Sequence, residues 1–236
     1  YVRNVTNQLG ARKSIIRLIL RRSFMAIKKE NEMFNIHDYN VNIGAREIYL
    51  YDEIDCESSM KFLKNLNILE SVNKKPIIVH QYSTGGEWSA GMVIYDAIKN
   101  SDCNFLFITH GCAASMGSVI PQAVYGKGLR LSTQNCDWLI HEGYLTVDNT
   151  TRAVTSVIDF EKNTKSAMYD IYTSVCCSGE YFKDQTPRKI KNYIRSKLAQ
   201  REDWWLTSRD AMFYGFTDGI LGDSDYKSIK EALNAI

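Results

Sequence analysis

The segment CNFLFITHGCAASMGSVIPQAVYG, residues 103–126, joins a strongly apolar run to a group of small residues and then to a second apolar run. The first run predicts a buried strand, and the residues from Ser115 onward predict a helix. Ser115 therefore lies on a strand-to-helix turn. Small residues there allow a helix to pack closely on a sheet, which is one interpretation. The other is a serine nucleophile held at the end of a strand.

The same order of strand and helix recurs around this segment. Strands are predicted at residues 46–54, 75–83 and 103–111, and helices at residues 56–73 and 88–100. Alternation of this kind predicts an α/β fold with a mainly parallel sheet. Farther along, short strands end at His141, a long helix is predicted at about residues 149–176, and Thr207 or Ser208 is the predicted N-cap of a short helix.

Composition limits the class of protein. The 236 residues are 44% hydrophobic with three prolines, which predicts one large folded domain. Six cysteines show no CxxC spacing, so we expect reduced thiols in a cytosol-like compartment. No apolar run of about 18 residues predicts a membrane span. The sequence contains no predicted metal cluster, dinucleotide fingerprint or GxxxxGK[ST] loop, so no cofactor and no metal are expected.

The N-terminal segment is strongly basic. Residues 1–29 contain eight Lys or Arg and no acid, and residues 11–29 place apolar side chains at helical spacing. We expect a basic N-terminal arm over residues 1–42, preceding a main domain over residues 43–236. An amphipathic arm or a helix that covers a subunit edge is the favoured interpretation. A transit-type segment is the alternative, and a nucleic-acid or membrane-surface patch is weaker.

A serine hydroxyl is a weak nucleophile and needs a base. Of the four histidines, His141 ends a predicted strand, where α/β proteins place their chemistry. His37 and His80 are given structural or surface roles, and His110 stays open. Asp203 is one of several candidate acids, and the two tryptophans that follow it are expected to shield it from water.

The motif STGGEW, residues 83–88, places a glycine pair after a predicted strand. Backbone amides at Gly85 and Gly86 are free to point into a cleft and stabilise an oxyanion. An ordinary turn is the alternative for this motif taken alone.

Four segments in order, STGGEWSAGMVIYDAI, GCAASMGS, WLIHEG and EDWWLTSRDAMFYGFTDGIL, resemble the Clp protease proteolytic subunit (ClpP) family over about residues 46–222. The resemblance implies a serine peptidase with the crotonase-like fold, built from repeated β-β-α units with a protruding handle over about residues 142–178. It implies that Ser115, His141 and Asp203 form the catalytic triad and that the backbone amides of Gly86 and Met116 stabilise the oxyanion. It further implies that four residues bind substrate: Gly85, Gly143, Tyr144 and Leu145.

The resemblance also implies an assembly. Two stacked heptameric rings, forming a homo-tetradecamer or one mixed with a paralogue, would enclose a chamber in which unfolded polypeptides are cut into short peptides for protein quality control. An AAA+ unfoldase would feed the chamber, with no nucleic-acid or membrane partner. The expected location is cytoplasmic, or an organelle stroma or matrix if the basic arm is a transit remnant.

Several positions depart from the family pattern and indicate a divergent member. Thr84 stands where the family usually has proline, and Ile78 and His80 stand where tyrosines help to receive unfoldase loops. Glu202 replaces a common arginine of ring contacts. The 62 positions from His141 to Asp203 are more than usual, with the extra residues expected around residues 176–190.

Two alternatives stay open. The first is a catalytically silent or paralogue-dependent structural subunit of a ClpP-type ring, favoured by the altered positions. The second is a crotonase-type acyl-CoA enzyme, in which residues 83–91 and 113–118 would form two oxyanion loops. No feature of the sequence predicts an adenine-nucleotide site, which disfavours the second.

Overall fold

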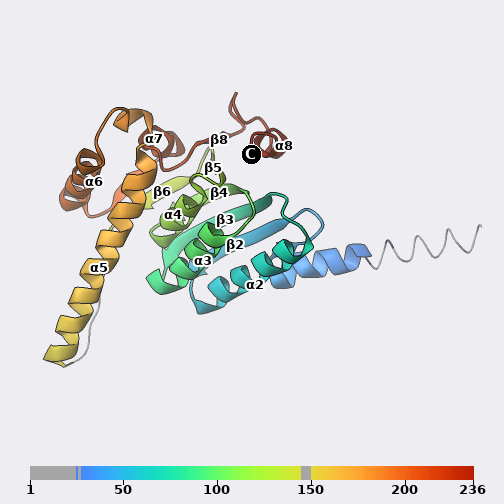
Figure 1. Ribbon diagram of the computed structural model, residues 1–236, viewed down its shortest axis with the longest axis horizontal. Coiled ribbons are helices and arrows are strands. Elements are labelled where there is room, and N and C mark those ends of the chain that lie inside the picture. Colours follow the sequence, from blue (N-terminus) through green and yellow to red (C-terminus); the bar gives the residue numbers. More distant parts are fainter. Residues whose placement is uncertain (1–24, 26–27, 145–149) are drawn as a thin grey trace, which may run out of the picture.

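The computed structural model describes residues 25, 28–144 and 150–236, and at its centre lies an eight-stranded sheet (Figure 1). The strands are β1 (Val41–Asn42), β2 (Glu47–Ile54), β3 (Ile77–Gly86), β4 (Phe105–Ala114), β5 (Gly128–Thr133), β6 (Asp137–Ile140), β7 (Trp204–Leu206) and β8 (Gly219–Leu221). Along the order β1-β2-β3-β4-β5-β8 every pair except β1–β2 is parallel. This confirms the predicted α/β fold.

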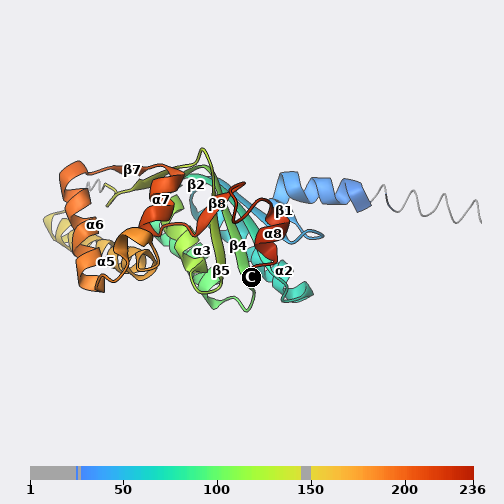
Figure 2. The same cartoon turned by 90° about the horizontal axis from the view of Figure 1, so that it is seen from above.

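The helices are α2 (Cys56–Val72), α3 (Trp88–Asn100), α4 (Met116–Val119), α5 (Thr151–Cys176), α6 (Pro187–Arg201), α7 (Ser208–Tyr214) and α8 (Ile229–Leu233). Residues 28–39 are also helical. Figure 1 shows α5 projecting away from the sheet as the predicted handle, and Figure 2 shows residues 28–39 at the opposite end of the molecule. Most of the basic N-terminal segment lies outside the described residues.

Two helix boundaries differ from the sequence prediction. The helix expected over residues 115–126 is instead the short α4 followed by a 3₁₀ helix at Ile120–Val124, with Pro121 in its first turn, where its missing N–H is tolerated. Helix α6 begins at Pro187, within the region of residues 176–190 where the extra residues are expected, because proline fits the first helical position. The predicted cap at Thr207 is confirmed by reciprocal hydrogen bonds with Asp210.

The strands alternate between two apolar clusters on opposite faces of the sheet. Ile77 and Phe105 belong to the large core beneath α2 and α3, whereas Ile78 and Leu106 belong to a smaller cluster covered by α8. Because neighbouring residues of a strand point to opposite faces, both faces of the central strands are buried.

A pair of histidines lies on the α8 side of β3 and β4. His80 Nδ1 and His110 Nε2 are 3.0 Å apart, and the Tyr49 ring stacks on His80 with centroids 5.2 Å apart. Tyr49 in turn donates a hydrogen bond to Glu47. Burial lowers the pKa of both imidazoles, against a smaller opposing effect of the Glu47 charge on His80. His80 and His110 are therefore bonded to each other across the strands.

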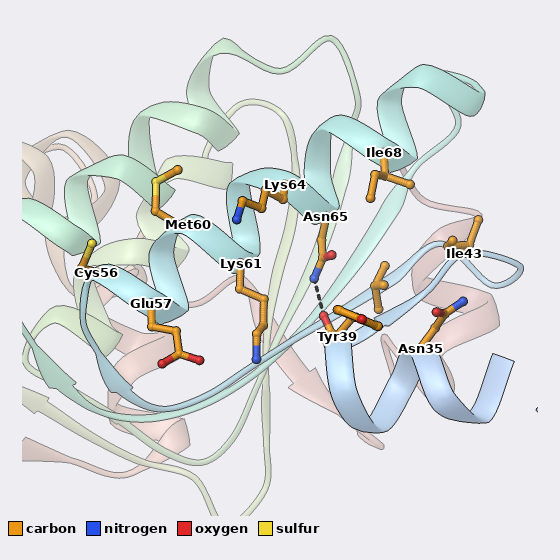
Figure 3. Close-up of a pocket in the computed structure, with 11 residues that line it drawn as sticks. Asn35, Tyr39, Ile43, Cys56, Glu57, Met60, Lys61, Lys64, Asn65 and Ile68 are labelled. Carbon is orange, nitrogen blue, oxygen red and sulfur yellow. Dashed lines mark hydrogen bonds between the residues drawn. The ribbon is translucent and has the colours of Figure 1, made fainter. Parts of the chain in front are cut away.

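An apolar groove of about 700 Å³ separates residues 28–39 from α2 (Figure 3). Met60 and Ile68 of α2 line it together with Ile43, and the Asn65 amide donates a hydrogen bond to the Tyr39 carbonyl at 2.7 Å. This hydrogen bond connects the end of the helix over residues 28–39 to α2.

No disulfide joins any of the six cysteines in the structure, and all six are in its described part. Within the described ranges, no helix combines the length and apolar character that a bilayer span requires.

A buried ion pair yields a stability prediction. Arg130, with its side chain only 1% exposed, binds both carboxylate oxygens of Asp218 and also Gln122. The variant Asp218→Asn leaves the guanidinium buried without its counter-charge, so we expect a loss of about 3–5 kcal/mol in unfolding free energy, measured by denaturant titration. Asp102→Asn is the control, since this 79% exposed carboxylate pairs with Lys74 at the surface and is worth about 1 kcal/mol or less. Equal losses would contradict the prediction.

The histidine pair yields a pH prediction. Because the folded-state pKa values of His80 and His110 lie below the reference value of 6.5, the unfolded chain binds more protons as the pH falls. Stability is thus complete above about pH 6.5 and decreases below it. The double variant His80→Phe/His110→Met is expected to lose less unfolding free energy than the parent between pH 7 and pH 5.

The matched control for that experiment is His37→Gln, which removes an exposed histidine and should leave the pH dependence unchanged. A double variant with the same pH dependence as the parent would refute the assignment.

Candidate active site

The position of Ser115 is set by a change of partner along β4. Residues 105–109 of β4 pair with β5, whereas Cys112, Ala113 and Ala114 pair with β6. Gly111, at φ +60°, lies between the two stretches. The ladder continues one residue further, since the Ser115 amide donates to the Leu139 carbonyl at 2.9 Å. Ser115 and the end of β6 are consequently neighbours.

Strand β6 also positions His141 and Asp203, the other two residues of the predicted triad. β7 runs antiparallel to β6, with Ile140 opposite Trp204, so the next pair in the register is His141 and Asp203. His141 Nδ1 lies 3.2 Å from Asp203 Oδ1. His141 Nε2 is buried and makes no hydrogen bond with any described group, although His141 and Ser115 line the same cavity. The three predicted residues are thus brought together by one strand and its two neighbours.

Ser115 has an unusual backbone conformation, with φ 53° and ψ −122°. Residues with a side chain rarely adopt this region, and holding one there costs about 1–3 kcal/mol. The turn is held by its own hydrogen bonds: Ser118 donates from its amide and its hydroxyl to the Ser115 carbonyl, at 2.9 and 2.7 Å. Tyr172 of α5 contacts the same hydroxyl at 2.7 Å. The serine is therefore fixed from two sides.

Both predicted glycines allow a close approach of backbone. A Cβ atom on Gly85 would lie 2.6 Å from the Ser115 Cβ, and one on Gly86 would lie 2.2 Å from the Ile54 carbonyl oxygen. Both residues have positive φ, at +105° and +149°. The end of β3 thus approaches Ser115 at Gly85, and Ile54 of β2 at Gly86, only because both residues lack a side chain.

The predicted site residues meet around two hollows. Gly86, Ser115, Met116, His141, Gly143 and Tyr144 all line a cavity of about 230 Å³, and Gly85 lines a neighbouring hollow of about 580 Å³. Leu145, the remaining residue expected in substrate binding, lies outside the described residues. In the described part of the chain, no three His, Cys, Asp or Glu side chains are grouped to hold a metal ion.

One expectation about the acid was wrong. Trp204 is buried, but Trp205 is 56% exposed and the Asp203 side chain is 52% exposed. The reason is strand alternation: Trp204 points into the core, so its neighbours on β7 point outward.

Sequence reasoning also missed a group that anchors the residue after His141. Tyr169 donates a hydrogen bond to Glu142 Oε1, and Lys165 Nζ lies 3.0 Å from Glu142 Oε2. Partial burial alone would raise the pKa of Glu142, but these two hydrogen bonds and the nearby cations hold it below its usual value. The spacing of Lys165 and Tyr169, four residues apart on the predicted long helix, was the available signal.

Comparison with known proteins gives a consistent result. The family model described as Clp protease matches residues 30–224. ATP-dependent Clp protease proteolytic subunit 1 of Protochlamydia amoebophila is 26% identical over 182 residues, which are 76% of this chain and 82% of that protein. The protein of the same name from Chlamydia trachomatis serovar D is 28% identical over 182 residues, covering 76% and 88%.

A solved structure of a ClpP1 mutant from Listeria monocytogenes has the same fold. It superimposes with a TM-score of 0.61 at 22% identity, covering 78% of this chain and 95% of that one.

The strain at Ser115 makes a testable prediction. Ser115→Gly and Ser115→Ala both remove the hydroxyl, but only glycine adopts this φ and ψ without strain. We expect the glycine variant to be more stable than the alanine variant by about 1 kcal/mol, measured by thermal or denaturant unfolding.

Ser174, an exposed residue within α5, provides the control pair. There Ser174→Gly should be less stable than Ser174→Ala by about 1 kcal/mol, because glycine disfavours a helix interior. The same ordering at both positions would contradict the assignment of strain to Ser115.

Proposed function

Because this chain belongs to the Clp protease family, we propose that it is a self-compartmentalised serine endopeptidase that cleaves unfolded polypeptides into short peptides. Ser115 attacks the peptide carbonyl, and His141 accepts its proton and then delivers it to the leaving amine. Asp203 holds the imidazole and stabilises its protonated form. The amides of Gly86 and Met116 stabilise the oxyanion.

One observation carries the proposal. The β6 register places His141 between Asp203 and the Ser115 turn, with Nδ1 directed at the carboxylate and Nε2 unpaired in the cavity. An imidazole that a carboxylate orients through one nitrogen, and whose other nitrogen lines the same cavity as a serine on a strained turn, supports a general-base role for His141.

The proposed assembly is a pair of stacked rings served by an AAA+ unfoldase, with Gly85, Gly143, Tyr144 and Leu145 in the path of an extended substrate. The protruding α5 supports a ring-to-ring contact, because it extends far from the sheet and exposes Ile158 (43%) and Phe160 (61%). Such apolar side chains on a projecting helix favour a protein partner.

A silent or paralogue-dependent subunit is the second candidate. It is favoured by the missing hydrogen bond at His141 Nε2 and by the half-exposed Asp203, since both leave the site incompletely ordered in the isolated chain. On that view the site becomes active only when another subunit orders it.

Mass and peptide cleavage measured on the same size-exclusion fractions distinguish the two. We expect cleavage of a short fluorogenic peptide in a ring-sized peak, and a reduction of at least about 1,000-fold in Ser115→Ala at unchanged elution volume. Fluorophosphonate labelling of Ser115 in the same peak is the second readout. A ring-sized peak that neither cleaves nor labels would favour the silent subunit.

A further inference from the structure

The cavity beside Ser115 has an apolar floor and acidic walls. Met116, Val119 and Met168 are buried, with 2–5% exposure, and form its apolar part. Three carboxylates also line it: Glu87, Glu142 and Glu161. No Lys or Arg is among its described lining residues.

Helix α5 supplies one wall of this cavity. Glu161, Thr164 and Met168 follow one another at spacings of three and four residues, so they share a face of the helix that lines the cavity. The wall thus changes from apolar at Met168 to acidic at Glu161 over two helical turns. The Glu161 side chain is only 22% exposed, which places its charge partly out of water.

Two described cations act on these carboxylates: Lys165, and Arg195, whose guanidinium lies over the Tyr169 ring and close enough to act on the Glu142 charge. Lys165 Nζ lies 3.0 Å from Glu142 and 3.7 Å from Glu161, so its hydrogen bond goes to Glu142. Glu142 is further satisfied by Tyr169. Three carboxylates and these two cations leave one formal negative charge around the cavity. Both cations act on Glu142, so Glu161, which is 3.7 Å from Lys165, is less compensated than Glu142.

We propose that this cavity receives a lysine or arginine side chain, so that the peptidase prefers a basic residue on the acyl side of the bond that Ser115 attacks. The inference rests on the proposed function and adds its substrate preference. The acyl side is assigned because the cavity is lined by Gly86 and Met116, whose amides would hold the oxygen of the attacked carbonyl.

The chemistry of these two side chains matches the walls. A long aliphatic stem packs along Met116, Val119 and Met168, while the cationic head reaches Glu161. A leucine in the same place would exclude water from the Glu161 carboxylate and add no hydrogen bond to its 3.7 Å ion pair with Lys165, which is unfavourable. The neighbouring hollow adds Glu53 to the acidic surroundings of Ser115, which further favours a cationic substrate segment.

The test compares fluorogenic peptides that differ only in the residue on the acyl side, with Lys, Arg, Leu, Met or Glu there. We expect kcat/KM for Lys and Arg to exceed that for Leu by at least about tenfold, roughly 1.4 kcal/mol. The variant Glu161→Gln should lower kcat/KM for the Lys and Arg peptides about tenfold and change the Leu peptide less than about twofold.

Asp159→Asn is the matched control. It makes the same change of charge on α5, but Asp159 is 65% exposed, pairs with Lys162 and does not line the cavity. It should leave all five kcat/KM values unchanged. Competition of peptides ending in argininal or leucinal against fluorophosphonate labelling of Ser115 gives the same comparison without turnover.

A preference for Leu that Glu161→Gln does not alter would overturn the inference while leaving the peptidase function intact. A basic preference confined to the amine side would overturn the assignment of this cavity. Absence of both cleavage and labelling in a ring-sized assembly would instead refute the proposed function, and the substrate preference with it.

Discussion

The site depends on one short strand. β6 is four residues long, yet it is hydrogen-bonded in parallel to the end of β4 and in antiparallel to β7. Each pairing has a fixed register. Ser115, the residue after β4, and Asp203, the residue before β7, are therefore both brought to the end of β6. A shift of one residue in either ladder would move His141 to the opposite face. The three-residue site is thus a consequence of backbone pairing, with side-chain contacts acting only at the last step.

Close approach is the second constraint. The end of β3 passes Ser115 with no space for a Cβ atom on Gly85, and a Cβ atom placed on Gly117 would lie 2.9 Å from the Ser83 carbonyl oxygen. These small residues let α4 begin directly on the sheet. The packing interpretation and the nucleophile interpretation of the same segment are therefore compatible. Small residues provide the space in which a strained serine is exposed to the cavity.

The parts that the sequence predicted well are the local ones. Strands and helices from Arg46 to Asn100, the long helix and the Thr207 cap follow from apolar periodicity and capping chemistry, which act within a few residues. Asp203 was selected with the resemblance, since nothing local distinguishes it from other acids. The histidine pair, the exposure of Asp203 and the Glu142 contacts depend on register between strands and helices far apart in sequence, which periodicity does not specify.

Helix α5 connects the outer part of the molecule with the chemistry. Its C-terminal half is in the core, where Tyr172 is fully buried and touches the Ser118 hydroxyl that holds the Ser115 turn. Tyr169, one turn earlier, and Lys165, two turns earlier, hold Glu142, next to His141. The N-terminal half projects from the sheet (Figure 1). Because a helix transmits a displacement along its axis, a contact made by the projecting half acts on the same rigid element that fixes both the serine turn and the residue after the histidine. The proposed ring contact and the order of the site therefore involve one and the same helix.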